Sequence, residues 1–224
     1  MAVIRGENLV RRFNSGKEVV EALKGVNLTI ATQTLTILKG RSGSGKTTLM
    51  NLLGGLDLPT AGRIFIDDQE LTAMTETSRD NFRRLNIGFV FQSIALISMM
   101  SAYENIEFGL RVAGYDPKDR KQRAEECLSL VGLGKRMEHR PHELSGGEQQ
   151  RVAIARAIAH RPKVVIADEP TAELDTHMGL QVVKLFKELV EREGITILMA
   201  THDPGMMEIA DQAFLLKDGE IGNE

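Results

Sequence analysis

The stretch "TLTILKGRSGSGKTTLMNLL", Thr34 to Leu53, decides the fold. Its first part is β-branched and apolar, which is typical of a buried strand that ends before Gly40. The glycines of "GRSGSG" then interrupt regular structure. The residues that follow place several leucines on one face of a helix: Leu49, Leu52 and Leu53. The expected order is therefore strand, glycine loop and helix.

The glycine loop fits the pattern G-x-x-x-x-G-K-[ST], whose residue types suit a phosphate. Glycines let successive backbone N–H groups converge on phosphate oxygens, and the helix N-terminus adds its dipole. Lys46 would reach the β- and γ-phosphates, and Thr47 would ligate Mg²⁺. A glycine turn with a surface lysine is the alternative, but the flanking strand and helix favour a nucleoside triphosphate. The predicted cradle comprises Gly40, Arg41, Ser42, Gly43, Ser44, Gly45, Lys46, Thr47 and Thr48.

Two adjacent carboxylates follow the apolar run "VVIA", residues 164–167. Such a run predicts a buried strand, which delivers Asp168 and Glu169 to the sheet edge where ligands bind in open α/β folds. We expect Asp168 to assist Mg²⁺ and Glu169 to act as general base on the attacking water. An ordinary acidic strand end is the alternative reading of "DE" alone, but the phosphate loop favours a catalytic role.

Polar side chains end further predicted strands. Gln92 closes "IGFVFQ" and His202 follows "ITILMAT". Gln92 could contact the metal or the water, and His202 could bond the γ-phosphate. Taken singly, a glutamine or histidine at a strand end more often has a structural role, but the set with Lys46 and Asp168 favours a site. We therefore predict Glu169, His202 and Gln92 as catalytic residues, and Thr47, Gln92 and Asp168 as metal ligands.

A second serine-glycine cradle lies in "LSGGEQQR", Leu144 to Arg151, at the start of a predicted helix. The first cradle, metal acid, base and γ-phosphate sensors already account for one hydrolytic site. The second cradle then has no phosphate in its own chain. The economical hypothesis is a two-fold dimer in which Ser145, Gly146 and Gly147 of each chain face the nucleotide of the other.

Composition limits the class of protein. The 224 residues carry a formal net charge of −3, with 42% hydrophobic and 26% charged residues. These values are typical of a globular domain with a sizeable core and give no global attraction to nucleic acid. The single cysteine excludes an internal disulfide framework and indicates a reducing compartment. No apolar run approaches the ~20 residues of a membrane helix, and no signal peptide is expected.

Strands alternate with helices at both ends of the chain, which predicts an α/β fold with a mainly parallel sheet. The first thirty residues suggest short strands, "AVIRGENLVRRF" and then "EVVEALKGVNLTI", with alternation and a glycine turn. The middle of the chain is largely helical, including a helix capped by Asp116 and Pro117. We expect a single domain over residues 1–224. Residues 1–92 and 160–224 would form the α/β core, and residues 93–159 an inserted helical subdomain.

The chain resembles the ATP-binding-cassette (ABC) ATPases over almost its whole length. The resemblance rests on the phosphate loop, Gln92, "LSGGEQQR", "VVIADEP", Leu174-Asp175 and "THD" in this order. "LLGGLDLPTAG", "AYENIEFGL" and "GEQQRVAIARA" look like the branch that powers macrolide exporters and lipoprotein-release systems. The resemblance implies a P-loop core with an N-terminal antiparallel β subdomain, ATP and Mg²⁺ as cofactors, and Ser145 to Glu148 as the signature. It also implies that Phe13 is the aromatic platform for adenine.

The resemblance further implies partners and location. These are a second copy of the chain and an integral membrane permease docking near residues 92–104, at the cytoplasmic face of the membrane. Two features depart from the common pattern. Glu173 could weaken closure or point to solvent, and Met99-Met100 could form an adaptable contact surface or core packing.

Two rival classes are a soluble cassette ATPase acting on ribosomes or DNA, and a regulator without turnover. The absence of a basic tail and the net charge of −3 argue against the first, and we expect no nucleic acid partner. The presence of Glu169 and His202 argues against the second. Nothing in the sequence identifies the transported molecule or its direction.

Overall fold

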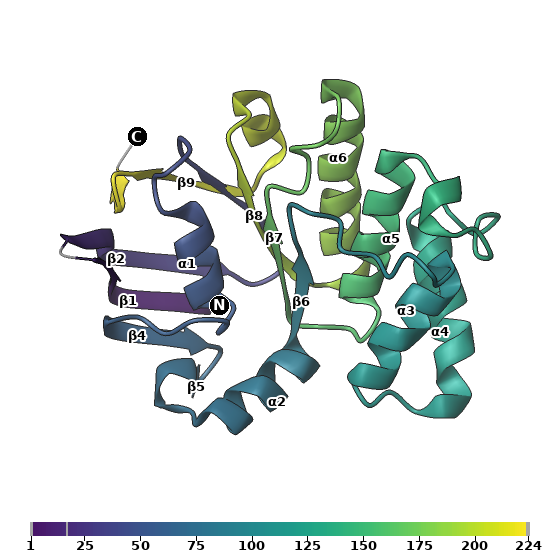
Figure 1. Ribbon diagram of the computed structural model, residues 1–224, viewed down its shortest axis with the longest axis horizontal. Coiled ribbons are helices and arrows are strands. Elements are labelled where there is room, and N and C mark those ends of the chain that lie inside the picture. Colours follow the sequence, from purple (N-terminus) through teal and green to yellow (C-terminus); the bar gives the residue numbers. More distant parts are fainter. Residues whose placement is uncertain (1, 17, 223–224) are drawn as a thin grey trace.

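A parallel sheet positions the predicted site residues. In residues 2–16 and 18–222, which the computed structural model describes, this sheet has six strands in the order β10-β9-β3-β8-β7-β6 (Figure 1). Neighbouring strands are parallel, except that β10 is antiparallel to β9. The strands are β3 Leu35–Lys39, β6 Ile87–Val90, β7 Val164–Asp168, β8 Thr196–Thr201, β9 Gln212–Lys217 and β10 Glu220–Gly222.

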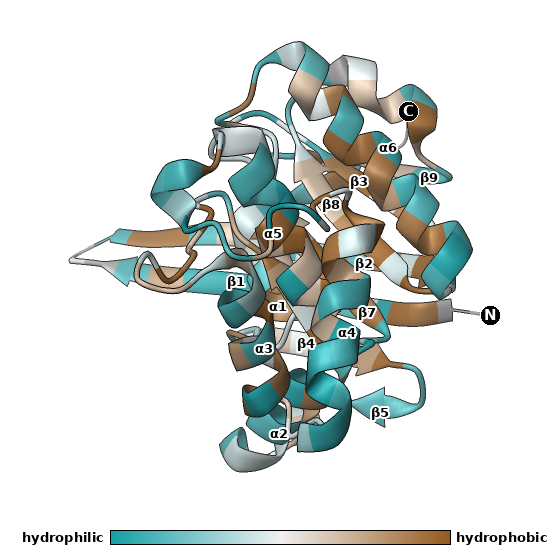
Figure 2. Cartoon of the chain, turned by 90° about the vertical axis from the view of Figure 1, so that its right-hand side faces the viewer, coloured by the Kyte–Doolittle hydropathy of each residue, from teal (hydrophilic) through white to brown (hydrophobic). Residues whose placement is uncertain are grey.

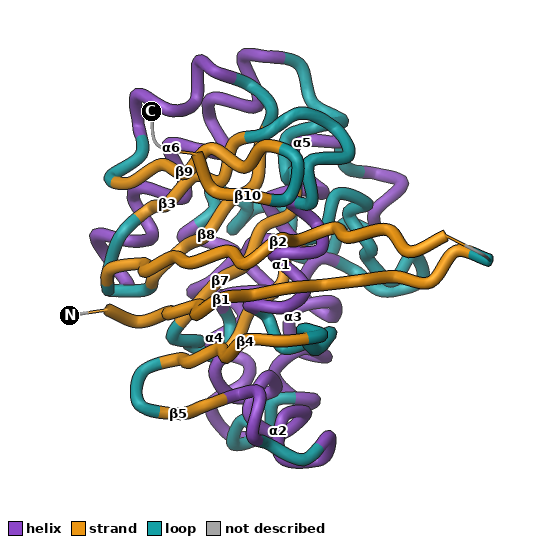
Figure 3. The backbone as a smooth tube through the Cα atoms, turned by 90° about the vertical axis from the view of Figure 1, so that its left-hand side faces the viewer, coloured by secondary structure: helices purple, strands orange, loops and turns teal. Residues whose placement is uncertain are grey.

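A separate antiparallel sheet has the order β2-β1-β4-β5, with β1 Ala2–Ser15, β2 Glu18–Ala31, β4 Ala61–Ile66 and β5 Gln69–Glu70. The two strands predicted over residues 2–13 and 18–30 are confirmed in position, but they are not short, because β1 and β2 are each 14 residues long. They form one hairpin that projects beyond the other strands (Figure 3). Register shifts at Gly6/Leu9 and Arg11/Arg12 interrupt the regular pairing of β1 with β2.

The helices match the sequence pattern where that pattern is amphipathic. Hydrophobic and hydrophilic residues alternate along the ribbon of α6 (Figure 2). Asp116 caps α4 by accepting from the Lys118 N–H, and Pro117 lies in the first turn of this helix. The sequence did not predict α2, since Phe82 is the buried residue of an otherwise polar segment. The bounds are α1 Lys46–Leu53, α2 Glu76–Asn86, α3 Ala102–Val112, α4 Pro117–Leu130, α5 Gly146–Ile158 and α6 Thr176–Glu193, with 3₁₀ turns at Leu71–Ala73, Pro141–Glu143 and Pro204–Ile209.

Two apolar cores cover the two faces of the parallel sheet. Val165 and Ala167 of β7 join the core formed with α3 to α6, whereas Val164 and Ile166 join the core formed with α1 and the antiparallel sheet. This alternation is the two-residue period of a strand buried on both faces. The predicted α/β class is therefore what the structure shows.

The predicted subdomain boundaries at 92/93 and 159/160 stay a prediction. α3, α4 and α5 lie within residues 93–159 and pack against one another. The apolar cluster that they form continues into one face of the sheet, so packing alone draws no sharp limit. The chain ends of the predicted domain, residues 1 and 224, lie outside the described residues.

Candidate functional site

The phosphate loop connects β3 to α1, as the sequence predicts. Gly43 and Gly45 have φ values of 79° and 103°, in the left-handed region that favours glycine. A Cβ at Gly45 would lie 2.7 Å from the carbonyl oxygen of Ala22 in β2, so no side chain fits there. A cavity of about 430 Å³ adjoins the loop, between residues 41–44 and the end of β9 at residues 215–218.

Lys46, the first residue of α1, is 5% exposed and is held by three oxygens. Its Nζ donates to the carbonyl oxygens of Gly40 at 2.9 Å and Arg41 at 3.3 Å. The same Nζ lies 3.1 Å from Oε1 of Glu169. The lysine charge therefore sits inside the loop and contacts the predicted general base directly.

Asp168 ends β7 with a carboxylate that lacks a full set of partners. Its Oδ1 is buried and has no hydrogen-bond partner among the described residues. Burial raises the pKa of Asp168 above its ordinary value and the charge of Glu169 adds to the rise, whereas a hydrogen bond from Thr47 and the charge of Lys46 oppose it. An orphaned buried carboxylate oxygen beside a threonine hydroxyl fits the ligand chemistry of Mg²⁺.

Glu169 occupies a strained position between two strand ends. Its φ of 46° is rare for a residue other than glycine, and such strain is concentrated at functional sites. The Glu169 N–H donates to the Ala200 carbonyl of β8 at 3.1 Å. Its Oε2 lies 3.2 Å from Nδ1 of His202, and its Oε1 lies 3.1 Å from Lys46. The fold thus brings Lys46, Glu169 and His202 into one contact network.

The remaining predicted residues lie around this network. Gln92 is exposed two residues after β6, whose end is paired with Ala167 of β7, so it is placed at the same sheet edge. The side chain of Ser44 is buried, and its Oγ has no partner within the described residues. Thr48 is half-buried in α1, and Phe13 is 40% exposed on β1. No sequence signal indicated the strained backbone of Glu169.

The signature begins α5 with an internal cap. The Ser145 Oγ accepts from the Glu148 N–H at 3.3 Å, and the Ser145 N–H donates to Oε2 of Glu148 at 2.9 Å. This backbone donor lowers the pKa of Glu148. Ser145 and Gly146 are exposed. Gly147 is buried, and a Cβ there would lie 2.3 Å from Cε of Met178 in α6. Contacts within the chain therefore explain why a glycine stands at position 147, but not why one stands at position 146.

The fold does not bring the signature to its own phosphate loop. Among the residues that the structure describes, no hydrogen bond or ion pair joins residues 145–148 to residues 40–48. The charged partner of Glu148 is Arg136, at 3.5 Å. The predicted residues thus fall into one assembled group around Lys46 and one separate, outward-facing group.

The assembled group can hold a triphosphate and activate water. The loop carries backbone N–H groups and the Lys46 ammonium, Asp168 and Thr47 carry oxygen atoms of the kind that ligate Mg²⁺, and Glu169 carries a carboxylate in contact with His202. The arrangement at the ends of parallel strands is that of a P-loop nucleoside triphosphatase.

Comparison with known proteins narrows this class. A family model described as "ABC transporter" matches residues 23–172. The macrolide export ATP-binding/permease protein MacB of Bartonella henselae is 44% identical over 220 residues, which cover 98% of this chain and 33% of that protein. The uncharacterized ABC transporter ATP-binding protein MJ1508 of Methanocaldococcus jannaschii is 42% identical, over 98% of this chain and 97% of that protein.

A solved structure agrees with the fold. The ATP-binding cassette MJ0796, solved as a dimer in a post-hydrolysis state with ADP and Pi, superposes with a TM-score of 0.89 at 38% identity, covering 98% of this chain and 97% of its own. This chain belongs to the ABC transporter family and is an ATPase of that family. It spans about a third of the length of MacB. No helix in the described residues is long and apolar enough to cross a membrane.

Proposed function

We propose that the chain is the ATP-hydrolysing subunit of a transport complex, working as a homodimer that holds two ATP molecules between its copies. The observation that carries this proposal is the split of the site. Lys46, Asp168, Glu169 and His202 are grouped at one sheet edge, whereas the exposed Ser145 has no link to them. The signature of each copy then completes the site of the other. Nucleotide binding and dimerisation are thereby linked by mass action.

Mg²⁺ would be held by Thr47, Asp168 and Gln92 together with phosphate oxygens. Within the described part of the chain, no group of three or more His, Cys, Asp or Glu side chains could hold a metal ion alone. This fits Mg²⁺, which protein sites usually bind through one or two carboxylates plus substrate phosphates. When bound, the ion neutralises charge that develops on the phosphates.

The ion pair between Lys46 and Glu169 suggests how the base is released for its task. The β- and γ-phosphates compete with Glu169 for Nζ of Lys46, which lies 3.1 Å from the carboxylate. Once Lys46 turns to the phosphates, Glu169 can accept a proton from the attacking water. His202, 3.2 Å from Oε2, keeps the carboxylate oriented. The strained backbone of Glu169 limits the positions that its carboxylate can take.

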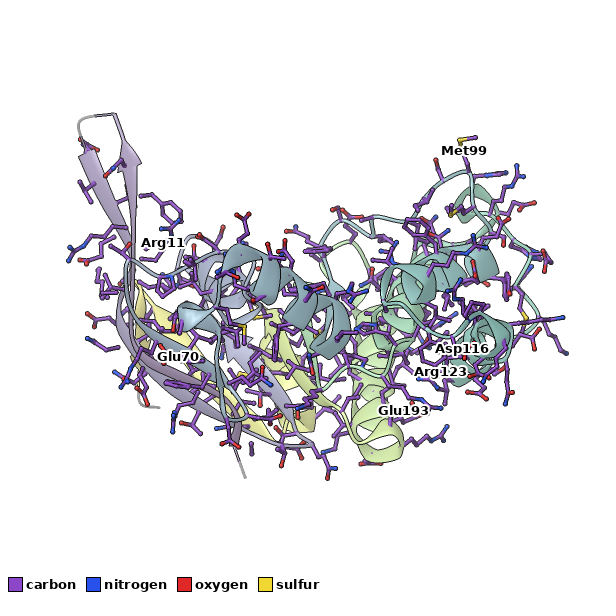
Figure 4. All side chains as sticks on the ribbon, turned by 90° about the horizontal axis from the view of Figure 1, so that it is seen from below. Arg11, Glu70, Met99, Asp116, Arg123 and Glu193 are labelled. Atoms are coloured by element: carbon purple, nitrogen blue, oxygen red, sulfur yellow. The ribbon has the colours of Figure 1, made fainter. Side chains whose placement is uncertain are left out.

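A separate membrane permease would dock on residues 92–104 and the groove beside them. Met99 is 82% exposed and projects from this segment (Figure 4). A groove of about 560 Å³ begins at Phe91, the residue before this segment, and lies between α2, α3 and the end of α5. Its lining includes the exposed side chains of Phe91, Phe108 and Val112. Exposed apolar patches of this kind mark partner surfaces. We place the subunit at the cytoplasmic face of the membrane, and nothing supports ribosomes or DNA as targets.

Two measurements test the proposal. Glu169→Gln should form an ATP-dependent dimer in light scattering, because ATP still binds while water is not activated; Lys46→Ala/Glu169→Gln, its control, should stay monomeric. A Glu169→Gln variant that is monomeric at saturating ATP contradicts the sandwich.

Affinity purification from detergent-solubilised native membranes should recover a membrane protein, and Phe108→Glu should lose it. Leu85→Glu, an exposed apolar position that does not line the groove, should retain it.

A further inference from the structure

A cation lies on the ring of Phe13. Arg11 and Phe13 are two residues apart on β1, and their side chains are in contact although a register shift lies between Arg11 and Arg12. The guanidinium carbon of Arg11 lies over the Phe13 ring, 4.6 Å from its centroid. This is the geometry of a cation–π contact. One face of the ring is therefore already covered by the protein itself.

The guanidinium is anchored to the loop that follows the phosphate-binding helix. The Arg11 Nη2 lies 3.0 Å and 2.9 Å from the two carboxylate oxygens of Asp57. Asp57 in turn accepts from the Leu58 N–H at 2.8 Å, and its own N–H donates to the Asn51 carbonyl of α1. Arg11 lies at the root of the projecting hairpin (Figure 4). The hairpin and α1 are thus tied together through this arginine.

Strand β2 connects the pairing partner of Phe13 to the phosphate loop. Phe13 is paired with Val20, two residues from Ala22, whose carbonyl oxygen contacts the position of Gly45. Two residues of a strand span about 7 Å. The ring is 40% exposed, so part of it stays open to a ligand. A base stacked there would leave its phosphates within reach of the loop.

We infer that Arg11 is a positioning residue for the adenine base: held by Asp57, it covers one face of Phe13 and presents the other face to the nucleotide. The inference deepens the proposed role of Phe13 as the adenine platform, which the family resemblance implies, and rests on it. A phenylalanine on a projecting hairpin has rotamer freedom, which binding must otherwise restrict. The anchored guanidinium removes this freedom before ATP arrives. The neighbouring Arg12 pairs with Glu21 at 2.8 Å and has no such contact with the ring.

The experiment compares ATP with inorganic tripolyphosphate, which lacks the base. Dissociation constants of both, with Mg²⁺, are measured by calorimetry for wild type, Arg11→Ala, Phe13→Ala, the double variant and Arg12→Ala. Arg11→Ala should weaken ATP roughly three- to ten-fold, the range of a partly exposed cation–π contact. Tripolyphosphate affinity should stay within about two-fold of wild type, since the phosphate loop is unchanged. Arg12→Ala should match wild type.

Coupling between the residues separates positioning from a general loss of structure. The double variant should bind ATP no more weakly than Phe13→Ala, because Arg11 acts through the ring. Asp57→Asn should reproduce the selective loss for ATP if Arg11→Ala does not fold. Thermal unfolding without nucleotide shows whether each variant is folded.

The outcomes distinguish the inference from the assignment beneath it. Unchanged ATP affinity in Phe13→Ala overturns the adenine platform itself. A loss in Phe13→Ala without one in Arg11→Ala overturns the positioning role alone. Equal losses of ATP and tripolyphosphate in Arg11→Ala, or tighter ATP binding, also overturn it, because the arginine would then act on the whole fold or block the ring.

Discussion

The two glycine cradles of this chain begin helices in opposite ways. α1 starts after Gly45, which has φ 103° and provides no side-chain cap. α5 starts after Ser145, which forms a reciprocal capping box with Glu148. The first N–H groups of a helix need acceptors from outside it. In α1 they are left for a phosphate, whereas in α5 the protein already satisfies part of them.

The two helix starts therefore leave different groups free to contact a ligand. The phosphate loop presents backbone N–H groups and the buried Lys46 to its own nucleotide. The signature presents a serine hydroxyl and the exposed Gly146 at the start of a helix whose first turn is partly capped by the protein itself. In the proposed dimer, the phosphate loop binds the nucleotide of its own chain, and the signature adds a contact to the nucleotide of the other copy. Variants in the two cradles should therefore fail differently.

The largest effect is expected at Lys46. Lys46→Ala removes the charge that the loop holds with Gly40 and Arg41, so ATP binding and turnover should both fall by at least about a hundred-fold. Calorimetry and phosphate release measure the two quantities. Thermal unfolding controls for folding. Retained turnover would show that the site lies elsewhere.

Ser145→Asp should separate binding from turnover. Aspartate is a good N-cap, so α5 keeps its start, but its charge repels the triphosphate of the other copy. Turnover should fall by roughly a hundred-fold, which is about 2.7 kcal/mol of activation free energy. ATP affinity of the monomer should stay unchanged. Ser145→Thr is the matched control and should keep turnover. Weaker binding by the Ser145→Asp monomer would place the signature at its own nucleotide instead.

Cys127 tests whether the two regions unfold together. It lies in α4, within the core shared by α5 and one face of the sheet. Burial raises the pKa of its thiol to about 11, from 9.0. The unfolded chain thus loses this proton at lower pH than the folded chain. The resulting stabilisation is present below pH 9.0 and is lost as pH rises to about 11, with a magnitude on the order of 2 kcal/mol.

Urea unfolding at several pH values, with Cys127→Ala as the reference, isolates this loss from lysine and tyrosine titration. Fluorescent ATP reports on the phosphate loop in the same samples. Loss of ATP binding together with helix content is expected, since the cores meet at one sheet. Helix loss with ATP binding intact would show two independent folding units.

The smallest effects distinguish the glycines of the signature. Gly147→Ala places a methyl group against Met178, whose flexible end can shift, so the free energy of unfolding should fall by about 1 kcal/mol. At Gly146 the nearest atom to a new Cβ is 3.9 Å away, so the fold should tolerate alanine. Turnover should nevertheless fall in Gly146→Ala if a nucleotide approaches there. Equal melting temperatures and turnover for the two variants would erase the distinction.

Much of the site could be predicted because short patterns carry it. The glycine loop, the strand before Asp168 and the helix of α6 follow local rules of backbone freedom and periodicity. The two strands of the hairpin could be located from their alternation, whereas the bulges at Gly6/Leu9 and Arg11/Arg12 could not, because they depend on how the two strands pair. α2 carries too few apolar residues to show a period. The contact of Arg11 with Phe13 joins residues two apart on one strand, across a register shift that the sequence does not reveal.

The residues able to hold a phosphate and activate water could be predicted from the sequence alone, because the patterns that indicate them are local in the chain. The sequence also determined that a second cradle existed. The folded chain was needed to show that Lys46, Glu169 and His202 form one contact network and that Ser145 lies outside it. The physical reason is the strand order β3-β8-β7, which brings loops far apart in sequence to one edge and leaves α5 on another side of the core.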